Sequence, residues 1–387
     1  MSASVPTLAP ATAAVDRPEH RLAVRLAFLV AGFGIACWAP LVPFARERLG
    51  IDDGALGALL LCLGLGSVAA MVAAGALSTR FGTRPVIVGS GLGLALVLPW
   101  LVVAASPWTL GLALMAFGAC LGSLDVAMNI NALEVERGAG RPMMSGFHAL
   151  YSVGGFIGAG VMTLLLSTGF EPLHAVLLAA APMVVAMVVA WPYVLATGRS
   201  AEGPLFVRPR GVVWLMALLA AATFLAEGAV LDWGALLITG AGLVPEAQGG
   251  LGFMLFSVAM TAGRFAGDAI VSRLGDRATL RVGGLVAVAG VAALLLASSP
   301  IVAFVGFVLI GLGASNLVPV LFRRAGQQSV MPAAFAVSAV TTAGYAGVLL
   351  GPALIGFLTQ AIGLASAFWL LAALLVLVPL SAGRLTR

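Results

Sequence analysis

Two carboxylates stand inside long apolar stretches of this chain, where an ionised side chain is costly. Asp125 lies in the apolar run 108–133, and Glu227 lies in the run 211–239. An apolar surrounding disfavours the charged form of a carboxylate, so such a group can bind and release a proton near neutral pH. Both residues are therefore candidates for proton coupling. The alternatives are a structural hydrogen bond for Asp125 and a solute-binding or gating role for Glu227.

Polar residues that follow Asp125 could contact a solute. Asn129 lies four residues further along and therefore shares the same face of a helix. His148 and Tyr151 begin the next apolar run, 143–168, so His148 could approach Asp125 or Asn129 in depth. A histidine titrates near neutral pH, but a lone histidine can equally be a packed hydrogen-bond donor.

Two further candidates for a solute cavity lie beside prolines. Asn316 is a candidate solute contact, and Pro319 behind it predicts a kink that could serve as a hinge. Trp38 precedes Pro40 and Pro43, and these prolines predict a bent outer end for the first apolar run. Trp38 itself could form an aromatic wall of a cavity or pack in the core.

Charged residues elsewhere in the apolar runs suggest ion pairing and gating. Arg264 and Asp268 are four residues apart, which predicts an i,i+4 ion pair at one end of a helix. Asp232 and Trp233 follow Glu227 closely, near the expected membrane interface. There Asp232 is a candidate for structure or gating, and Trp233 for an interfacial anchor.

The composition indicates a membrane protein. Of 387 residues, 61% are hydrophobic and only 9% are charged, whereas a soluble domain carries about 25% charged residues. All twenty basic residues are arginine, because the sequence contains no lysine. This excludes a Walker-type phosphate loop and Schiff-base chemistry. Without a nucleophile–base or metal constellation, we expect neither an enzyme nor a cofactor.

The elements that must position these residues are membrane helices. One span needs about 20 mostly apolar residues, and twelve runs meet this requirement. The predicted spans are 22–44, 54–78, 85–105, 108–133, 143–168, 173–196, 211–239, 249–272, 279–298, 300–322, 332–360 and 363–383. We expect a disordered cytoplasmic N-terminus (1–21), an N-terminal six-helix bundle (22–196), a cytoplasmic linker (197–210) and a C-terminal six-helix bundle (211–387).

The arginines set the orientation of the predicted spans. With the N-terminus in the cytoplasm, every arginine except Arg46 and Arg48 falls in a cytoplasmic loop or helix end, as the positive-inside rule requires. We therefore expect both termini in the cytoplasm and a multi-pass protein of the bacterial inner membrane. Membrane topology, and not binding of nucleic acid, then explains the basic pI of about 9.8. A monomer surrounded by lipid is expected.

The two halves share arginine and glycine patterns at a constant offset of 193 residues, for example from position 80 to position 273. The matched residues are Arg80, Gly82 and Arg84 with Arg273, Gly275 and Arg277; Gly118 with Gly311; and Gly154 and Gly158 with Gly347 and Gly351. Three matches at one offset, each in the corresponding run, indicate a duplicated six-helix unit.

Two six-helix halves in parallel repeat resemble the major facilitator superfamily, whose substrates are held near the midplane between the halves. The segment from Gly75 to Arg84, GALSTRFGTR, is similar to that superfamily's loop 2–3 motif, GxLxDRxGRR. Thr79 replaces the motif's aspartate, which in the family helps to latch the outward-open state. The second copy of the motif keeps an acidic residue, Asp268, but one turn earlier than the position of the motif's aspartate.

Within the superfamily, the segment 122–129, GSLDVAMN, resembles the fucose-permease-like branch, in which an acidic residue precedes an asparagine by four positions. The resemblance implies secondary transport by alternating access. We expect proton-coupled uptake of a small polar solute, sugar-like or an organic acid, with efflux of amphipathic compounds as the alternative. A non-transporting membrane sensor is the alternative from another class. Expected gating and loop residues are Gly75, Arg80, Gly82, Arg84, Asp232, Arg264, Asp268, Arg273, Gly275 and Arg277.

Overall fold

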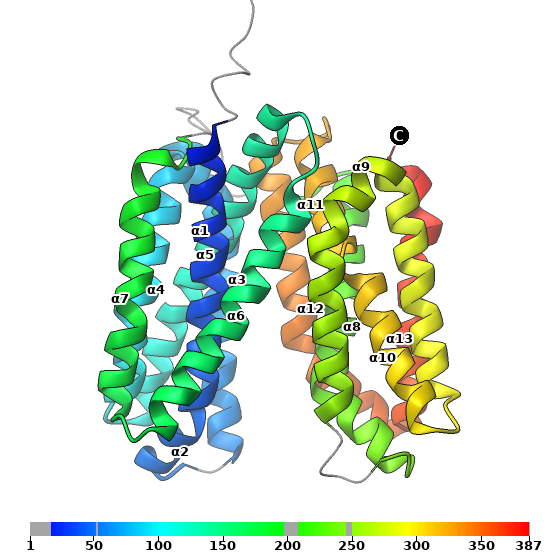
Figure 1. Ribbon diagram of the computed structural model, residues 1–387, viewed down its shortest axis with the longest axis horizontal. Helices are drawn as coiled ribbons and strands as arrows, with labels where there is room; N and C mark the ends of the chain where they lie inside the picture. The colour runs from blue at the N-terminus through cyan, green and yellow to red at the C-terminus, as the bar shows by residue number, and fades with distance from the viewer. Residues whose placement is uncertain (1–16, 52, 197–207, 245–249, 387) are drawn as a thin grey trace, which may run out of the picture.

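The computed structural model describes residues 17–51, 53–196, 208–244 and 250–386, and it is built of helices (Figure 1). The N-terminal half contains α1 (Pro18–Trp38), α2 (Val42–Leu49), α3 (Asp53–Phe81), α4 (Thr83–Val103), α5 (Pro107–Ala139), α6 (Met144–Ser167) and α7 (Pro172–Ala190). The C-terminal half contains α8 (Val212–Gly240), α9 (Gly250–Leu295), α10 (Pro300–Ala314), α11 (Leu317–Gln327), α12 (Ala333–Ile362) and α13 (Leu364–Leu385). Most of the predicted linker, 197–210, lies outside the described residues.

The described helices account for the twelve predicted spans. Ten stretches are long and apolar enough to cross a membrane. One of them, α9, crosses twice because the backbone of Gly275 (φ 73°, ψ 165°) leaves the helical region and reverses the chain (Figure 1). Gly82, at the equivalent position of the other half, also has a positive φ of 85° between α3 and α4. With α12, twelve spans result, and the predicted fold class is confirmed.

Prolines interrupt the helices where the sequence predicts bends. After Trp38 the chain forms a 3-10 turn, Ala39–Leu41, before α2 continues it, so the bent outer end of the first span is confirmed. The tenth span is split into α10 and α11 at Ser315 and Asn316. Pro319 explains this break, because its ring excludes a helical hydrogen bond to the carbonyl group of Ser315.

The structure corrects two predicted boundaries. α1 begins at Pro18, so residues 18–21, predicted to be disordered, are helical; proline at the first helical position and Glu19 in the first turn favour this start. α5 continues six residues beyond the predicted end at position 133, to Ala139. This extension carries Glu136, and it ends where Gly140 takes the left-handed conformation (φ 63°).

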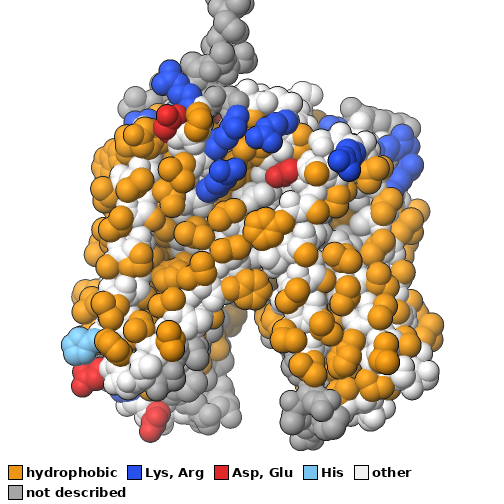
Figure 2. Space-filling view, viewed as in Figure 1, with side chains coloured by type: hydrophobic (Ala, Val, Ile, Leu, Met, Phe, Trp, Pro, Cys, Tyr) orange, Lys and Arg blue, Asp and Glu red, His pale blue; other side chains and the backbone are white. Residues whose placement is uncertain are grey.

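The two halves form separate bundles that meet at one end of the molecule (Figure 1). Both described chain ends lie there, together with Arg84, Arg137, Arg277 and Arg324; we call it the arginine-rich end. The bundles contact each other mainly through α3 with α12 and α6 with α9. Figure 2 shows that a cleft separates the bundles from the opposite end inward, and that basic side chains gather over the closed end.

Matched glycines let helices pack closely in both bundles. A side chain on Gly118 of α5 would clash with the backbone carbonyl oxygen of Leu63 in α3, and one on Gly311 of α10 would clash with that of Phe256 in α9. Leu63 and Phe256 are themselves separated by the same offset as the two glycines. The sequence repeat therefore corresponds to equivalent helix contacts in the two halves.

Candidate functional site

Three polar residues predicted to lie together are joined in the N-terminal bundle. Asp125, Asn129 and His148 are all buried. The amide nitrogen of Asn129 donates to the backbone carbonyl oxygen of Asp125 at 2.8 Å, and Nε2 of His148 lies 3.2 Å from Oδ1 of Asn129. The expected approach of His148 to Asn129 is thus confirmed.

Aromatic rings hold His148 between the two bundles. Its ring lies edge-on to Phe28 of α1, with centroids 5.1 Å apart, and 5.6 Å from the ring of Phe322 in α11. Phe28 also stacks on Phe147 at 5.9 Å. This surrounding favours the interpretation of His148 as a packed hydrogen-bonding residue that positions Asn129.

A pair of tyrosines joins the bundles next to this group. The side chains of Tyr151 in α6 and Tyr345 in α12 lie next to each other, and both lie close enough to Asp125 to interact with its charge. Both are half-buried. Tyr151 was predicted from the sequence, but Tyr345 was not. The available signal was that the chain has only three tyrosines and that Tyr345 falls one position from the repeat equivalent of Tyr151.

Arg264 is paired differently from the prediction. Its Nη2 lies 3.8 Å from Oε2 of Glu227 in α8, and its Nη1 donates to the hydroxyl of Ser152 in α6 at 2.9 Å. The predicted i,i+4 ion pair with Asp268 is therefore wrong. The reason is that Asp268 has stronger partners in the other bundle, while Arg264 turns toward the carboxylate on α8.

Asp268 caps the first turn of α6. Its Oδ1 accepts from the backbone N–H of Ser145 at 2.9 Å, and its Oδ2 accepts from that of Gly146 at 2.8 Å. These amides have no partner within their own helix, and the positive end of the helix dipole attracts a carboxylate. Because Asp268 belongs to the C-terminal bundle and α6 to the N-terminal one, this contact holds the bundles together.

We expect Asp268→Asn to loosen the start of α6, because an amide side chain offers one acceptor oxygen where the carboxylate offers two. The loss should be about 1–2 kcal/mol, typical of a helix cap. Hydrogen–deuterium exchange on the peptide that contains Ser145 and Gly146 should accelerate about fivefold or more. The first turn of α7, where Glu171 gives no side-chain cap, serves as the internal reference. Unchanged exchange in the Ser145 peptide would contradict the capping role.

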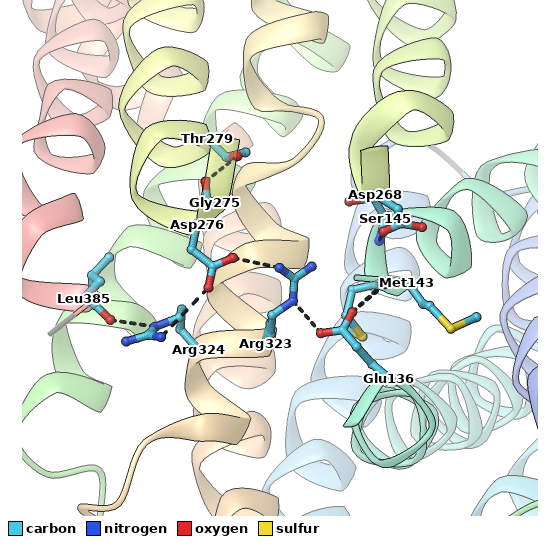
Figure 3. A network of polar contacts seen from close by, with 11 residues as sticks. Glu136, Met143, Ser145, Asp268, Gly275, Asp276, Thr279, Arg323, Arg324 and Leu385 are labelled. Atoms are coloured by element: carbon cyan, nitrogen blue, oxygen red, sulfur yellow. Dashed lines mark hydrogen bonds and ion pairs between the residues drawn. The ribbon is translucent and has the colours of Figure 1, made fainter. Parts of the chain in front are cut away.

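A second charged network lies at the arginine-rich end and was not predicted (Figure 3). Nε of Arg323 in α11 donates to Oε1 of Glu136 in α5 at 2.5 Å, and its Nη1 donates to Oδ1 of Asp276 at 2.7 Å. The other oxygen of Glu136 accepts from the backbone N–H groups of Met143 and Met144. The Arg323 and Glu136 side chains are each only 6% exposed. This cross-bundle ion pair therefore closes the arginine-rich end.

Neighbouring contacts reinforce this closure. Arg137 of α5 donates to the carbonyl oxygen of Gly326 in α11. On the other side of the interface, the hydroxyl of Ser338 in α12 donates to the carbonyl oxygen of Met71 in α3 at 2.6 Å. Gly75 lies against the same Ser338 and leaves no room for a side chain, which agrees with a gating role for that glycine.

The remaining loop residues act within single bundles. Arg84 donates to the carbonyl oxygen of Val194 at 2.7 Å, which joins the start of α4 to the segment that follows α7. Arg80 lies over the ring of Phe81 at 5.4 Å. Arg277 lies beside Gly383 in α13, whereas Arg273 is exposed.

Two other predicted residues, Trp38 and Asn316, lie outside this group and make different contacts. Trp38 is buried in the larger apolar core, so core packing is the observed role. Asn316 lies at the break between α10 and α11, and its side-chain amide donates to the carbonyl oxygen of Gly263 in α9 at 3.0 Å. This hydrogen bond joins the break to α9. The side chain of Asp232 lies outside the described part of the structure.

Two helical bundles that enclose buried polar groups and close at one end are typical of membrane transporters. The family follows from comparison with known proteins: residues 25–330 match the model of the Major Facilitator Superfamily, and the chain belongs to this superfamily. It is therefore a multi-pass membrane transporter and not an enzyme.

Relatives and solved structures agree with this assignment. An uncharacterized MFS-type transporter of Yersinia pestis is 47% identical over 370 residues, covering 95% of this chain and 96% of the relative. Membrane protein MosC of Rhizobium meliloti is 32% identical, covering 92% and 88%. Among solved structures, the MFS transporter FucP in its outward conformation is similar at a TM-score of 0.75 and 16% identity, covering 96% and 100%. The human organic anion transporter MFSD10 has a TM-score of 0.77 at 17% identity, covering 95% and 100%.

Proposed function

We propose that the protein takes up a small polar solute together with protons across the bacterial inner membrane. The observation that carries this proposal is the group formed by Asp125, Asn129, Tyr151 and Tyr345, which joins both bundles deep within the membrane-spanning part. Tyr151 lies seven residues after the start of α6, so roughly 10 Å of helix separates it from that end. A solute held there would be contacted by both halves.

The proposed orientation places the arginine-rich end in the cytoplasm, in agreement with the positive-inside rule. In this orientation the cleft of Figure 2 would face the outside. The proposed state is outward-open, with its cytoplasmic end closed by Glu136, Arg323 and Asp268. Uptake requires the bundles to rock so that these contacts break and the cleft closes on the opposite side. Binding of solute and proton must favour that second state, because a ligand shifts an equilibrium only through differential affinity.

Asp125 is proposed to carry the coupling proton. A carboxylate held in an apolar surrounding and next to two tyrosine hydroxyls can exist in either protonation state, and each state interacts differently with a bound solute. Protonation from the outer side would remove the negative charge before the bundles close. Release toward the cytoplasm would restore it. Asn129, fixed by His148, is proposed to contact the solute.

We expect Asp125→Asn to abolish proton-driven accumulation but to retain solute exchange, because the neutral side chain mimics the protonated state permanently. Proteoliposomes containing a pH-sensitive dye would be given L-fucose, D-xylose, D-gluconate, D-lactate or tetraphenylphosphonium under an inward proton gradient. Wild-type protein should acidify the lumen with a polar solute, and the initial rate should fall about 100-fold or more in the variant, as expected for loss of an essential proton-transfer group.

The matched control is Glu171→Gln, whose carboxylate is 80% exposed at the other end of the molecule; it should transport normally. Accumulation by Asp125→Asn at the wild-type rate would refute the coupling role. Loss of both accumulation and exchange would indicate a structural role. Proton-driven export of tetraphenylphosphonium, with no uptake of the polar solutes, would favour efflux over uptake.

A further inference from the structure

Arg264 is a cation placed unusually deep in the membrane-spanning part. It lies eleven residues before the Gly275 bend, so about 16 Å of helix separates it from the arginine-rich end. Its side chain is only 11% exposed. A buried charge in this region is costly and marks a functional site by default. The described arginines of the closing network instead lie at the helix ends.

The guanidinium group of Arg264 is incompletely satisfied. It has five N–H donors, but its Nε has no hydrogen-bond partner. Its distance of 3.8 Å to Glu227 exceeds the length of a hydrogen bond. One oxygen of Glu227 is likewise buried without a partner. Arg323 also has one buried nitrogen without a partner, Nη2, but it binds its two carboxylates at hydrogen-bond distances of 2.5 Å and 2.7 Å. The Arg264–Glu227 pair is therefore a loose contact, in which Arg264 keeps a free hydrogen-bond donor and Glu227 keeps a free acceptor.

Groups from four other helices surround this arginine. Glu227 approaches from α8, while His148 and Tyr151 approach from α6. Asp125 of α5 and Tyr345 of α12 lie further from Arg264, close to Tyr151. Asp268, on the same helix as Arg264, is occupied by the first turn of α6. Arg264 is thus the positive charge of a site otherwise made of carboxylates, hydroxyls and one imidazole.

We propose that Arg264 binds the carboxylate of a small hydrophilic organic acid, and that Glu227 occupies the arginine while the site is empty. This inference rests on the proposed transport function and names its substrate class. The planar fork of a guanidinium matches a carboxylate in two-point contact. Ser152, Tyr151 and Tyr345 would supply hydroxyl contacts to the remainder of the solute.

The exchange of carboxylates also explains why protons would enter with the acid. When Glu227 takes up a proton, Arg264 loses its internal partner and the positive charge is left for the solute. The anion then replaces the charge that the proton removed, so the pair of sites gains no net charge. A proton on Asp125 acts in the same direction, because it removes a second negative charge that would repel the anion. Acid binding should therefore strengthen as the pH falls.

The test uses pairs of solutes that differ by one carboxylate: D-gluconate with D-glucitol, D-lactate with 1,2-propanediol, and benzoate with benzyl alcohol. Thermal unfolding of the purified full-length protein is measured with each at pH 5.5 and pH 8, since a bound solute raises the Tm. We expect at least one acid to raise the Tm, more strongly at pH 5.5, while its alcohol has no effect. Arg264→Gln should abolish the shift, and the control Arg281→Gln, an exposed arginine beyond the Gly275 bend of α9, should retain it.

Two further variants keep the proposal testable if Arg264→Gln fails to fold. Arg264→Lys keeps the charge but loses the fork, so acid binding should weaken about tenfold, or 1.4 kcal/mol. Glu227→Gln removes the internal competitor, so at pH 8 this variant should bind the acid more tightly than the wild type does at pH 8. Weaker acid binding by Glu227→Gln at pH 8 would overturn the proposal.

The remaining outcomes separate this proposal from the proposed function. Stabilisation by the alcohols equal to that by the acids, an acid shift that survives Arg264→Gln, or no shift with any of the acids would overturn the carboxylate site. A neutral solute bound alike by wild type and Arg264→Gln would leave proton-coupled uptake intact. Acid binding that depends on Arg264, without any proton-driven accumulation in proteoliposomes, would support the site and refute the transport mechanism alone.

Discussion

Glu136→Gln is expected to open the arginine-rich end and shift the protein toward the state in which the cleft is closed. In the structure, one carboxylate oxygen of Glu136 binds Arg323 of the opposite bundle, and the other binds two backbone amides. Glutamine keeps one acceptor oxygen but removes the charge. Arg323 would then retain only Asp276 of its own bundle as an ionic partner. The contact that is lost is therefore the one that joins the bundles.

The effect should be large because both partners are almost fully buried. Breaking a buried pair by altering one member leaves an incompletely compensated charge, and about 2–3 kcal/mol is a reasonable loss given the hydrogen bonds that glutamine preserves. This corresponds to a change of about 30- to 150-fold in the ratio of the two states.

Spin labels on cysteines introduced at Phe81 and Ser329 would report the separation of the bundles by pulsed electron spin resonance. Both are exposed residues at this end, and they belong to opposite bundles.

The control for this experiment is Glu134→Gln, on the same helix. Glu134 pairs with Arg137 at 2.7 Å, three residues further along α5, so its neutralisation leaves the bundles joined. The distance distribution should broaden toward longer values in Glu136→Gln and stay at the wild-type distance in Glu134→Gln. Equal distributions in both variants would show that the Glu136–Arg323 pair does not set the conformational equilibrium.

A double-mutant cycle would separate pairing from local damage. If Glu136 and Arg323 act mainly through each other, the double variant Glu136→Gln with Arg323→Gln should shift less than the sum of the single variants. Additive shifts would mean that each residue acts through other partners, namely the amides of Met143 and Met144 or the carboxylate of Asp276.

The fold could be predicted because its determinants, long apolar runs and an internal repeat, are visible in the sequence. A span of about 20 apolar residues is a strong signal, and the 193-residue offset of the glycines reports backbone contacts that recur in both halves. Local interruptions such as the break before Pro319 were also predictable, since proline acts on its own helix. Helix ends were less predictable: the extension of α5 to Ala139 contains charged residues, which apolar runs do not register.

The candidate site was predictable only where its residues lie close together in sequence or at a similar depth on consecutive helices. Asn129 and Asp125 lie on one helix, and His148 follows in the next. The partner of Arg264 was predicted wrongly because i,i+4 spacing permits an ion pair but does not select it over an acid on another helix. The positions of Tyr345 and of the Glu136–Arg323 pair depend on how the two bundles pack against each other. A single sequence does not show which residues of the two bundles are in contact.

Gly118→Ala is expected to destabilise the N-terminal bundle strongly, although alanine is the smallest possible addition. Its Cβ would overlap the backbone carbonyl oxygen and carbonyl carbon of Leu63, and backbone atoms cannot rotate away as a side chain can. α5 and α3 would have to separate along their length, so we expect a loss of about 3 kcal/mol, at the upper end for overpacked cores. Gly311→Ala should behave alike against Phe256.

Gly160→Ala is the matched control, because a methyl group on that glycine of α6 meets no atom within 4 Å. In an exposed helical position, alanine stabilises by about 0.5–1 kcal/mol relative to glycine. The two substitutions are chemically identical and should change the Tm in opposite directions in one detergent. If Gly118→Ala and Gly160→Ala have the same Tm, the close approach of α5 to α3 does not stabilise this bundle. The repeated glycines would then need another explanation.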